Sequence, residues 1–265
     1  MAQISKPVRP HRSATTSTII LLTLLSPCMA QTKTTSPFTD QATGIQFQRF
    51  FGARTNFGFG IALPQTPNTS FIGQLTFPLV NRAGWGGFSL TGDMEGPLLM
   101  AAWADGAGGV VSSFRQAFDE DNDPPEVTGA FSVRPIAEAT SANGSFLTYT
   151  FLCEGCLGAA LGLDAAAATT AEMGWALGSR AVRNPGSSAG ALAFHDTGFG
   201  DFEADLAAAR SAQFDTWAAL AGAPLQPAAG ARAFDLAAGD GEGDSGDEGG
   251  ADEGDRDGEE SDDDD

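Results

Sequence analysis

Residues 98–114 read LLMAAWADGAGGVVSSF, and this stretch decides the fold class. The segment 98–103 is apolar on both faces, which is typical of a strand covered on both sides in the middle of a sandwich. The glycine-rich segment 105–109 is a hairpin signal, and 110–114 follows it as a second strand. The stretch therefore predicts two neighbouring β-strands.

Similar short segments extend outward from this hairpin, separated by Gly and Pro, from residue 38 to residue 153. In one of them Phe71, Leu75 and Phe77 fall on one face, while Gln74 and Thr76 fall on the other. Further strands are expected over 127–135, 145–153 and 173–177, with a polar loop at 184–190. Many short strands with frequent turn signals predict an all-β antiparallel β-sandwich.

Two segments are candidates for helix. Apolar residues at helical spacing predict a C-terminal helix over 201–221, which Gly222 and Pro224 end. The Ala-rich segment 159–171 is a second candidate, although glycines interrupt its start and Thr169-Thr170 its end.

The N-terminal segment 1–30 has the pattern of a secretory signal peptide. Lys6, Arg9 and Arg12 precede a short apolar run at 19–25, and small residues precede a cleavage site before Gln31. The apolar run is shorter than the about 20 residues that a membrane span needs. We therefore expect a secreted, extracellular protein without a membrane span.

The C-terminal segment 228–265 is rich in Gly, Asp and Glu. From Asp235 to Asp265 it holds sixteen acidic residues and a single base, Arg256. It offers almost no apolar surface to offset the entropy of ordering, so we predict a disordered acidic tail. The functional alternative is electrostatic: capture of divalent cations or screening of partners. One folded domain is then expected over 31–227.

The charge of the folded part excludes nucleic acid as a partner. The whole chain has a formal net charge of −20, and residues 31–234 hold ten Lys and Arg against eighteen Asp and Glu. Binding a polyanion needs clustered bases, which this segment lacks.

The folded part contains two cysteines, Cys153 and Cys156. A secreted context favours a disulfide between them. The CxxC spacing also occurs in c-type haem attachment, but Leu157 stands where that motif has His. A zinc site would need further Cys or His ligands, and only His195 remains. A redox-active pair would need a thioredoxin-like βαβ pattern, which we do not find.

His195 is the only histidine outside the N-terminal leader, so any chemistry that needs an imidazole must use it. We see no βαβ architecture that could hold the Gly-x-Ser-x-Gly elbow of a serine hydrolase, and we see no dehydrogenase site. One His and one Met could fill both axial positions of a haem iron. Met100 and Met173 lie in predicted strands and are expected to fill the core, whereas Met94 lies in a turn.

The chain resembles the secreted cytochrome b domain found in fungal cellobiose dehydrogenases and in iron-reductase-type cytochromes. Eight groups of short motifs carry the resemblance and occur in family order. They are FTD with TGIQF (38–47), FGF with FIGQ (57–74), WGGFSL to Met94 (85–94), LLMAAWADG (98–106), VVSS with Arg115 (110–115), FLCEGC (151–156), GWA (174–176), and FHD with GF (194–199).

The resemblance implies an immunoglobulin-like sandwich holding one non-covalent haem b, with Met94 and His195 as axial ligands and Cys153 and Cys156 as a disulfide. It also implies one-electron transfer. The expected donor is a flavin dehydrogenase or a small reductant. The expected acceptor is a copper polysaccharide monooxygenase, Fe(III), as in iron reduction, or a quinone. No dinucleotide-binding motif follows the domain, so we expect it to stand alone.

The chain departs from the family pattern near the propionates of the haem. The family carries a Tyr shortly after the Ser-Ser-x-Arg motif, whereas this chain has the acidic segment 119–121 there and no Tyr. Acidic side chains beside propionates are unfavourable, and Arg115 is the base that could compensate. A sandwich does not fix function, so a haem-free domain that binds carbohydrate or another secreted partner stays an alternative.

Two N-glycosylation sequons fall in expected loops, at Asn68-Thr69-Ser70 and Asn143-Gly144-Ser145. In a secreted protein both asparagines are candidate glycan acceptors.

Overall fold

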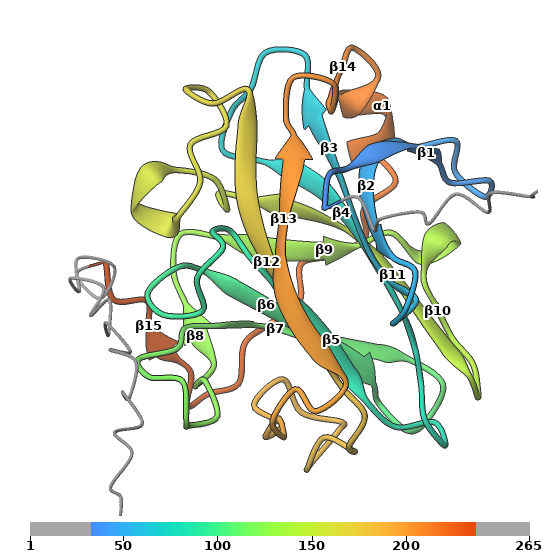
Figure 1. Cartoon of the computed structure of the whole chain (residues 1–265), viewed down its shortest axis with the longest axis vertical. Coiled ribbons are helices and arrows are strands. Elements are labelled where there is room, and N and C mark those ends of the chain that lie inside the picture. Colours follow the sequence, from blue (N-terminus) through green and yellow to red (C-terminus); the bar gives the residue numbers. More distant parts are fainter. Residues whose placement is uncertain (1–32, 237–265) are drawn as a thin grey trace, which may run out of the picture. The chain divides into compact units, whose positions relative to one another are not determined.

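The computed structural model describes residues 33–236, which form two sheets packed face to face (Figure 1). The larger sheet has the order β1-β2-β3-β4-β11-β10, with β9 also paired with β11 and β14 paired with β3. Its strands are β1 (Ser36–Thr39), β2 (Gln46–Gly52), β3 (Phe57–Pro64), β4 (Phe71–Pro78), β9 (Ser132–Pro135), β10 (Ser141–Ala142), β11 (Phe146–Glu154) and β14 (Arg210–Ser211).

The second sheet has the order β13-β12-β5-β6-β7, and all its pairs are antiparallel. Its strands are β5 (Trp85–Ser89), β6 (Leu99–Ala104), β7 (Val110–Arg115), β12 (Thr170–Gly178) and β13 (Gly198–Asp205). A small parallel pair joins β8 (Val127–Thr128) to β15 (Arg232–Ala233). Short helices are η1 (Ala137–Ala139), η2 (Ala159–Leu161) and α1 (Phe214–Ala218).

Aromatic side chains from both sheets fill the space between them. Phe59 of β3 lies 4.4 Å from Phe88 of β5, measured between ring centroids, and Phe88 stacks on Phe151 of β11 at 6.1 Å. Alternate residues of each strand supply these rings, because successive side chains of a strand point to opposite faces. The all-β antiparallel sandwich predicted from the sequence is confirmed.

The outer faces of both sheets are also partly covered. Phe214 and Trp217 of α1 pack on the larger sheet. On the second sheet, Trp85 and Trp103 form a cluster with Val182 from the loop that follows β12. The predicted burial of segment 98–103 on both faces therefore holds, because Met100 belongs to the inner core and Trp103 to the outer cluster.

The helix predicted over 201–221 is wrong over most of its length. Phe202 and Ala204 are fully buried and alternate with the exposed Glu203, so this part continues β13, which pairs with β12. Only the five residues of α1 are helical. Pairing with a neighbouring strand outweighs the weak intrinsic preference for helix.

The Ala-rich segment 159–171 is not an α-helix either. It holds the single turn η2, after which Gly162 adopts a φ of 110°, and β12 begins at Thr170. The strand expected over 127–135 is divided into β8 and β9.

The described structure continues beyond residue 227, the boundary expected for the domain. Arg232 N donates to Glu126 O at 3.0 Å and Phe234 N to Thr128 O at 2.9 Å, so β15 is part of the fold. The predicted signal peptide, 1–30, and the acidic residues after 236 lie outside the described residues.

Cys153 and Cys156 form the predicted disulfide, at the end of β11. Asn68 and Asn143 lie on exposed turns, where each side chain accepts hydrogen bonds from the backbone, and their glycosylation stays a prediction. Within 33–236, no helix has the length and hydropathy of a membrane span.

Candidate functional site

A cavity of about 480 Å³ lies on the outer face of the five-stranded sheet. Three segments form its walls: the turn that follows β5, the acidic loop after β7, and the loop between β12 and β13. The loop between β12 and β13 lies at the bottom of Figure 1. The volume falls within the roughly 300–1,000 Å³ of typical cofactor and ligand pockets.

The floor of the cavity consists of small side chains. Gly87 on β5 pairs with Ala101 on β6 and with Ala176 on β12, so the three residues share the outer face. One step along the strands, Gly174 pairs with Ser89, and a Cβ atom added to Gly174 would lie 2.5 Å from the Ser89 Oγ. Because these residues carry small side chains or none, they leave space for a ligand above this face of the sheet.

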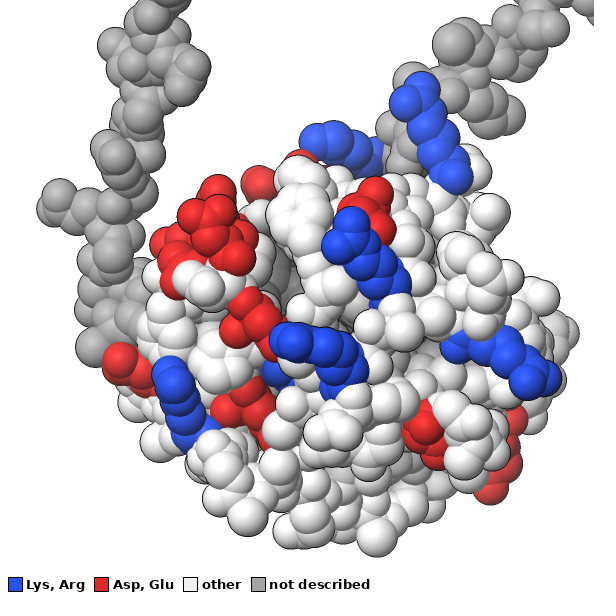
Figure 2. All heavy atoms as spheres, turned by 90° about the horizontal axis from the view of Figure 1, so that it is seen from below, with Lys and Arg blue, Asp and Glu red and all other residues white. Residues whose placement is uncertain are grey.

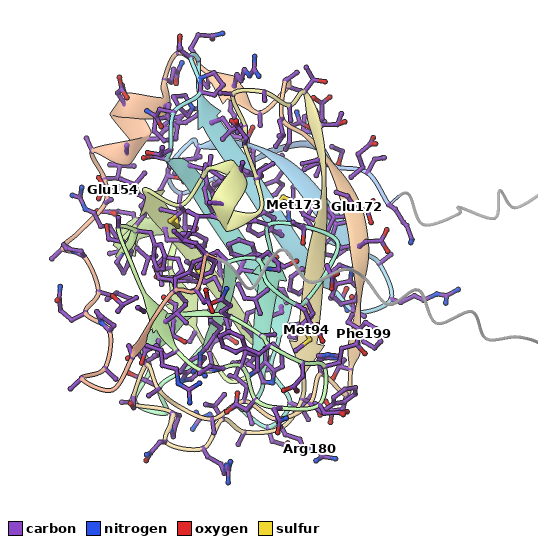
Figure 3. The ribbon with its side chains drawn as sticks, turned by 90° about the vertical axis from the view of Figure 1, so that its left-hand side faces the viewer. Met94, Glu154, Glu172, Met173, Arg180 and Phe199 are labelled. Atoms are coloured by element: carbon purple, nitrogen blue, oxygen red, sulfur yellow. A yellow bond between two sulfur atoms is a disulfide. The ribbon has the colours of Figure 1, made fainter. Side chains whose placement is uncertain are left out.

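Met94 lies in the wall formed by the turn after β5. The Asp93 Oδ1 accepts hydrogen bonds from the backbone N of Met94 at 2.6 Å and of Glu95 at 3.2 Å, which fixes the tight turn. The thioether is half-buried and lines the cavity, and Figure 3 shows it beside Phe199 of β13. This turn therefore exposes a soft sulfur ligand to the cavity instead of to the core.

His195 lies in the wall formed by the loop between β12 and β13. Its ring centroid is 4.2 Å from that of Phe194, 4.5 Å from Phe199 and 6.4 Å from Trp85. Its Nδ1 is buried and has no hydrogen-bond partner among the described residues. Burial lowers the pKa of the imidazole from its ordinary value of 6.5, which favours the neutral form that binds metals.

The backbone on both sides of His195 is held by hydrogen bonds. The Trp85 Nε1 donates to Ala193 O at 2.9 Å. On the other side, the Asp196 carboxylate accepts from Ser179 N at 2.7 Å and from the Ser179 Oγ at 2.9 Å. The position of the imidazole is therefore set by its neighbours.

The structure thus brings Met94 and His195, about a hundred residues apart in the sequence, to the lining of one cavity. Met173 is fully buried in the core, as expected. Met100 also belongs to the core and is 1% exposed, although it touches the cavity floor from below. No group of three His, Cys, Asp or Glu side chains within the described ranges could hold a metal ion.

Acidic side chains line the cavity beside the segment where the family Tyr is missing. Glu120 and Asp121 belong to the lining, and Figure 2 shows acidic side chains gathered beside a hollow at this end of the molecule. Arg115 also reaches the cavity. However, it donates four hydrogen bonds to protein oxygens and pairs with Asp123, so it does not offer a free cation to a propionate.

Several lining residues were not singled out by sequence reasoning as parts of a site. The floor had a detectable signal, because small residues recur at every second position in Gly87, Ser89, Gly174 and Ala176. Nothing in the sequence pointed to Asp123, which is not part of the lining but contacts Arg115 and the backbone of Leu192, on a distant loop.

A haem fits this combination of features. The cavity has a floor of small side chains, and its lining offers one thioether and one imidazole that burial shifts toward the neutral form and whose Nδ1 has no partner among the described residues. One His and one Met are a known axial pair for haem iron in cytochromes.

Comparisons with known proteins agree with this geometry. The family model for the cytochrome domain of cellobiose dehydrogenase matches residues 38–216. A pyrroloquinoline quinone-dependent pyranose dehydrogenase of Coprinopsis cinerea is 27% identical over 163 residues, or 60% of this chain and 19% of that protein. The match thus spans about a fifth of the length of this curated relative.

Two solved structures share the fold. The cytochrome domain of Myriococcum thermophilum cellobiose dehydrogenase has a TM-score of 0.64 and 29% identity, covering 71% of this chain and 96% of its own. The cytochrome b domain of pyranose dehydrogenase from Coprinopsis cinerea has a TM-score of 0.61 and 25% identity, covering 70% of this chain and 95% of its own. Because the family match spans 38–216, well over half of the chain and all three walls of the cavity, this chain belongs to the family of cellobiose dehydrogenase cytochrome domains.

Proposed function

We propose that this protein is a secreted b-type cytochrome that carries single electrons, with Met94 and His195 as the axial ligands of one non-covalent haem b. The observation that carries the proposal is the presence of both side chains on one cavity lining, in a chain of this family.

The haem supplies a reversible one-electron iron couple when bound. The chain's own residues determine how that couple is used. With Met94 and His195 as its protein ligands, the iron would have no open position for oxygen or peroxide, so the haem would pass electrons and would not activate substrates. The thioether also favours Fe(II) and raises the reduction potential. The small side chains of Gly87, Ala101 and Ala176 would leave room for the haem beside the sheet.

The exchange of electrons takes place at the mouth of the cavity. Phe194 and Phe199 stand there with 63% and 65% of their surfaces exposed, so a partner can approach closely. The relatives are named as a pyranose dehydrogenase and a cellobiose dehydrogenase, so the proposed donor is a sugar dehydrogenase. The flavin dehydrogenase expected from the sequence would be one such donor. A copper polysaccharide monooxygenase, Fe(III) or a quinone completes the proposal as acceptor.

Visible spectra of protein produced with a haem supply test the ligand pair. We expect a low-spin, six-coordinate spectrum in the wild-type protein. His195→Ala and Met94→Ala should lose this spectrum and hold haem at least about tenfold more weakly, since each variant removes a bond to the iron. Met173→Leu is the matched control, because this methionine is fully buried in the core and is not part of the cavity lining.

Absence of a Soret band in the wild-type protein, or a native spectrum in His195→Ala, would contradict the proposal. The alternative, a haem-free sandwich that binds carbohydrate or another secreted partner, predicts glycan binding by a colourless protein.

A further inference from the structure

Arg115, the last residue of β7, is almost completely buried, which is unusual for an arginine. Only 2% of its surface is exposed, and burial lowers the pKa of its guanidinium. Removing a cation from water costs several kcal/mol by common estimates, and an apolar side chain of similar size is often as stable. A gain in stability alone therefore does not account for an arginine here.

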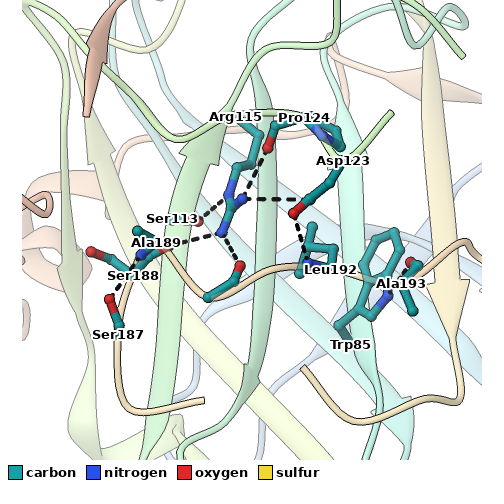
Figure 4. A network of polar contacts seen from close by, with 11 residues as sticks. Trp85, Ser113, Arg115, Asp123, Pro124, Ser187, Ser188, Ala189, Leu192 and Ala193 are labelled. Carbon is teal, nitrogen blue, oxygen red and sulfur yellow. Dashed lines mark hydrogen bonds and ion pairs between the residues drawn. The ribbon is translucent and has the colours of Figure 1, made fainter. Parts of the chain in front are cut away.

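The guanidinium connects three separate segments of the chain, as Figure 4 shows. Its Nε donates to the Ser113 Oγ at 2.7 Å, within β7. One terminal nitrogen donates to Pro124 O at 2.9 Å, in the loop after β7. The other donates to Ser188 O at 2.8 Å and to Gly190 O at 2.7 Å, in the loop that carries His195.

Asp123 extends this network toward His195. One of its carboxylate oxygens lies 3.7 Å from the Arg115 Nη1, and the other accepts a hydrogen bond from Leu192 N at 3.2 Å. The next residue, Ala193, is the one whose carbonyl receives the Trp85 Nε1. The backbone from 188 to 193 is thus held at four points just before the imidazole.

We propose that Arg115 and Asp123 are positioning residues, which hold the loop 188–193 so that the His195 imidazole faces the cavity and the Met94 thioether. The inference rests on the proposed function. It explains why the Arg115 guanidinium donates its hydrogen bonds to these loops. It also explains how the His195 ring is held in position although its Nδ1 has no hydrogen-bond partner among the described residues. Glu120 and Asp121, on the same loop as Asp123, are then brought to the cavity lining by the same network.

Three variants test this role. Arg115→Gln removes the fork of donors, Arg115→Lys keeps the charge but cannot reach three segments, and Asp123→Asn weakens the pair while keeping an acceptor for Leu192. Arg134→Gln is the matched control. Arg134 donates to Gly222 O at 2.7 Å and to Ala221 O at 3.0 Å and pairs with Glu154, but it lies on β9 away from the cavity.

The first measurement is amide hydrogen exchange of residues 188–193 in the haem-free full chain. We expect Arg115→Gln to accelerate exchange by about tenfold or more, because hydrogen bonds from a charged group are lost, with smaller effects for Arg115→Lys and Asp123→Asn. The second is the haem-loaded protein: the Arg115→Gln spectrum should show a five-coordinate fraction, a shifted reduction potential and faster haem loss. Arg134→Gln should change neither measurement, even if it lowers the melting temperature.

The inference is overturned if Arg115→Gln keeps wild-type exchange rates, low-spin spectrum and potential, or if Arg134→Gln alters them equally. Should Arg115→Gln fail to fold, Asp123→Asn must still accelerate exchange at 188–193 for the inference to stand. A wild-type protein without haem would refute the proposed function, while the exchange measurement would still decide whether the network holds the loop.

Discussion

The imidazole of His195 is surrounded by rings of Phe194, Phe199 and Trp85, and its buried Nδ1 has no partner within the described residues. Desolvation in this setting penalises the imidazolium, so the neutral form is favoured in the folded protein. A metal ligand must be neutral at its coordinating nitrogen, and the pocket provides that state before any cofactor binds.

This environment predicts a pH effect in the haem-free protein. The folded-state pKa of His195 lies below 6.5, so the unfolded chain binds more protons between the two values. The free energy of unfolding should therefore rise with pH up to about 6.5, and it should fall as the pH drops through the folded pKa. NMR titration of a chain lacking residues 1–30, in which His195 is the only histidine, gives the pKa.

The control for this effect is His195→Gln, whose denaturant unfolding should lack the same slope between the folded pKa and 6.5. An identical pH dependence in both proteins, or an NMR midpoint above 6.5, would show that the ring is not desolvated.

Among the elements, β15 shows how the end of the chain supports the Met94 wall. The Gln116 side chain is fully buried and exchanges two hydrogen bonds with the backbone of Asp235, at 2.8 and 2.9 Å. The same amide donates to Gly96 O at 2.9 Å, in the turn that carries Met94. Phe234 adds an edge contact with Phe131 at 6.0 Å.

Truncation after Pro227 should therefore destabilise the domain, although the composition places the tail boundary there. It removes β15 and leaves the buried Gln116 amide partly unsatisfied, which costs about 1–3 kcal/mol of unfolding free energy. Truncation after Leu236 keeps these contacts and should match the full chain. Chemical denaturation measures both, and equal stability of the two truncated chains would contradict the role assigned to β15.

At the scale of the whole molecule, charge is the dominant property. The chain has a formal net charge of −20, and the residues after 236 include fifteen carboxylates and one arginine. Within the described ranges, Glu120 and Asp121 add acidic groups at the cavity itself. Such a field attracts cationic partners and repels anionic ones, and salt screens it beyond about 10 Å at 0.1 M.

The rate of electron transfer from the reduced protein should therefore change with ionic strength in opposite directions for a cationic and an anionic oxidant. Stopped-flow rates should fall with ionic strength for hexaammineruthenium(III), a cation, and rise for hexacyanoferrate(III), an anion. The chain ending at Leu236 should show smaller slopes of the same sign, because Glu120 and Asp121 remain. Salt-independent rates with both oxidants would contradict electrostatic steering.

Local sequence patterns predicted most of the strands because short apolar runs bounded by turn residues are typical of strands. The segments 98–103 and 110–114 lie on either side of a glycine-rich turn, and the structure places β6 and β7 there. The same reasoning failed over 201–221, where helical spacing and strand alternation overlap and only the pairing of β13 with β12 decides between them.

The sequence by itself determined the all-β fold, the disulfide and the two candidate ligands, because each depends on residue type, spacing or motif order. Only the tertiary structure decided that Met94 and His195 share a cavity, that Gly87 and Ala176 form its floor, and that Arg115 is committed to the loop before His195. These are contacts between segments far apart in the chain, and such contacts form when the sheets pack, so no local pattern records them.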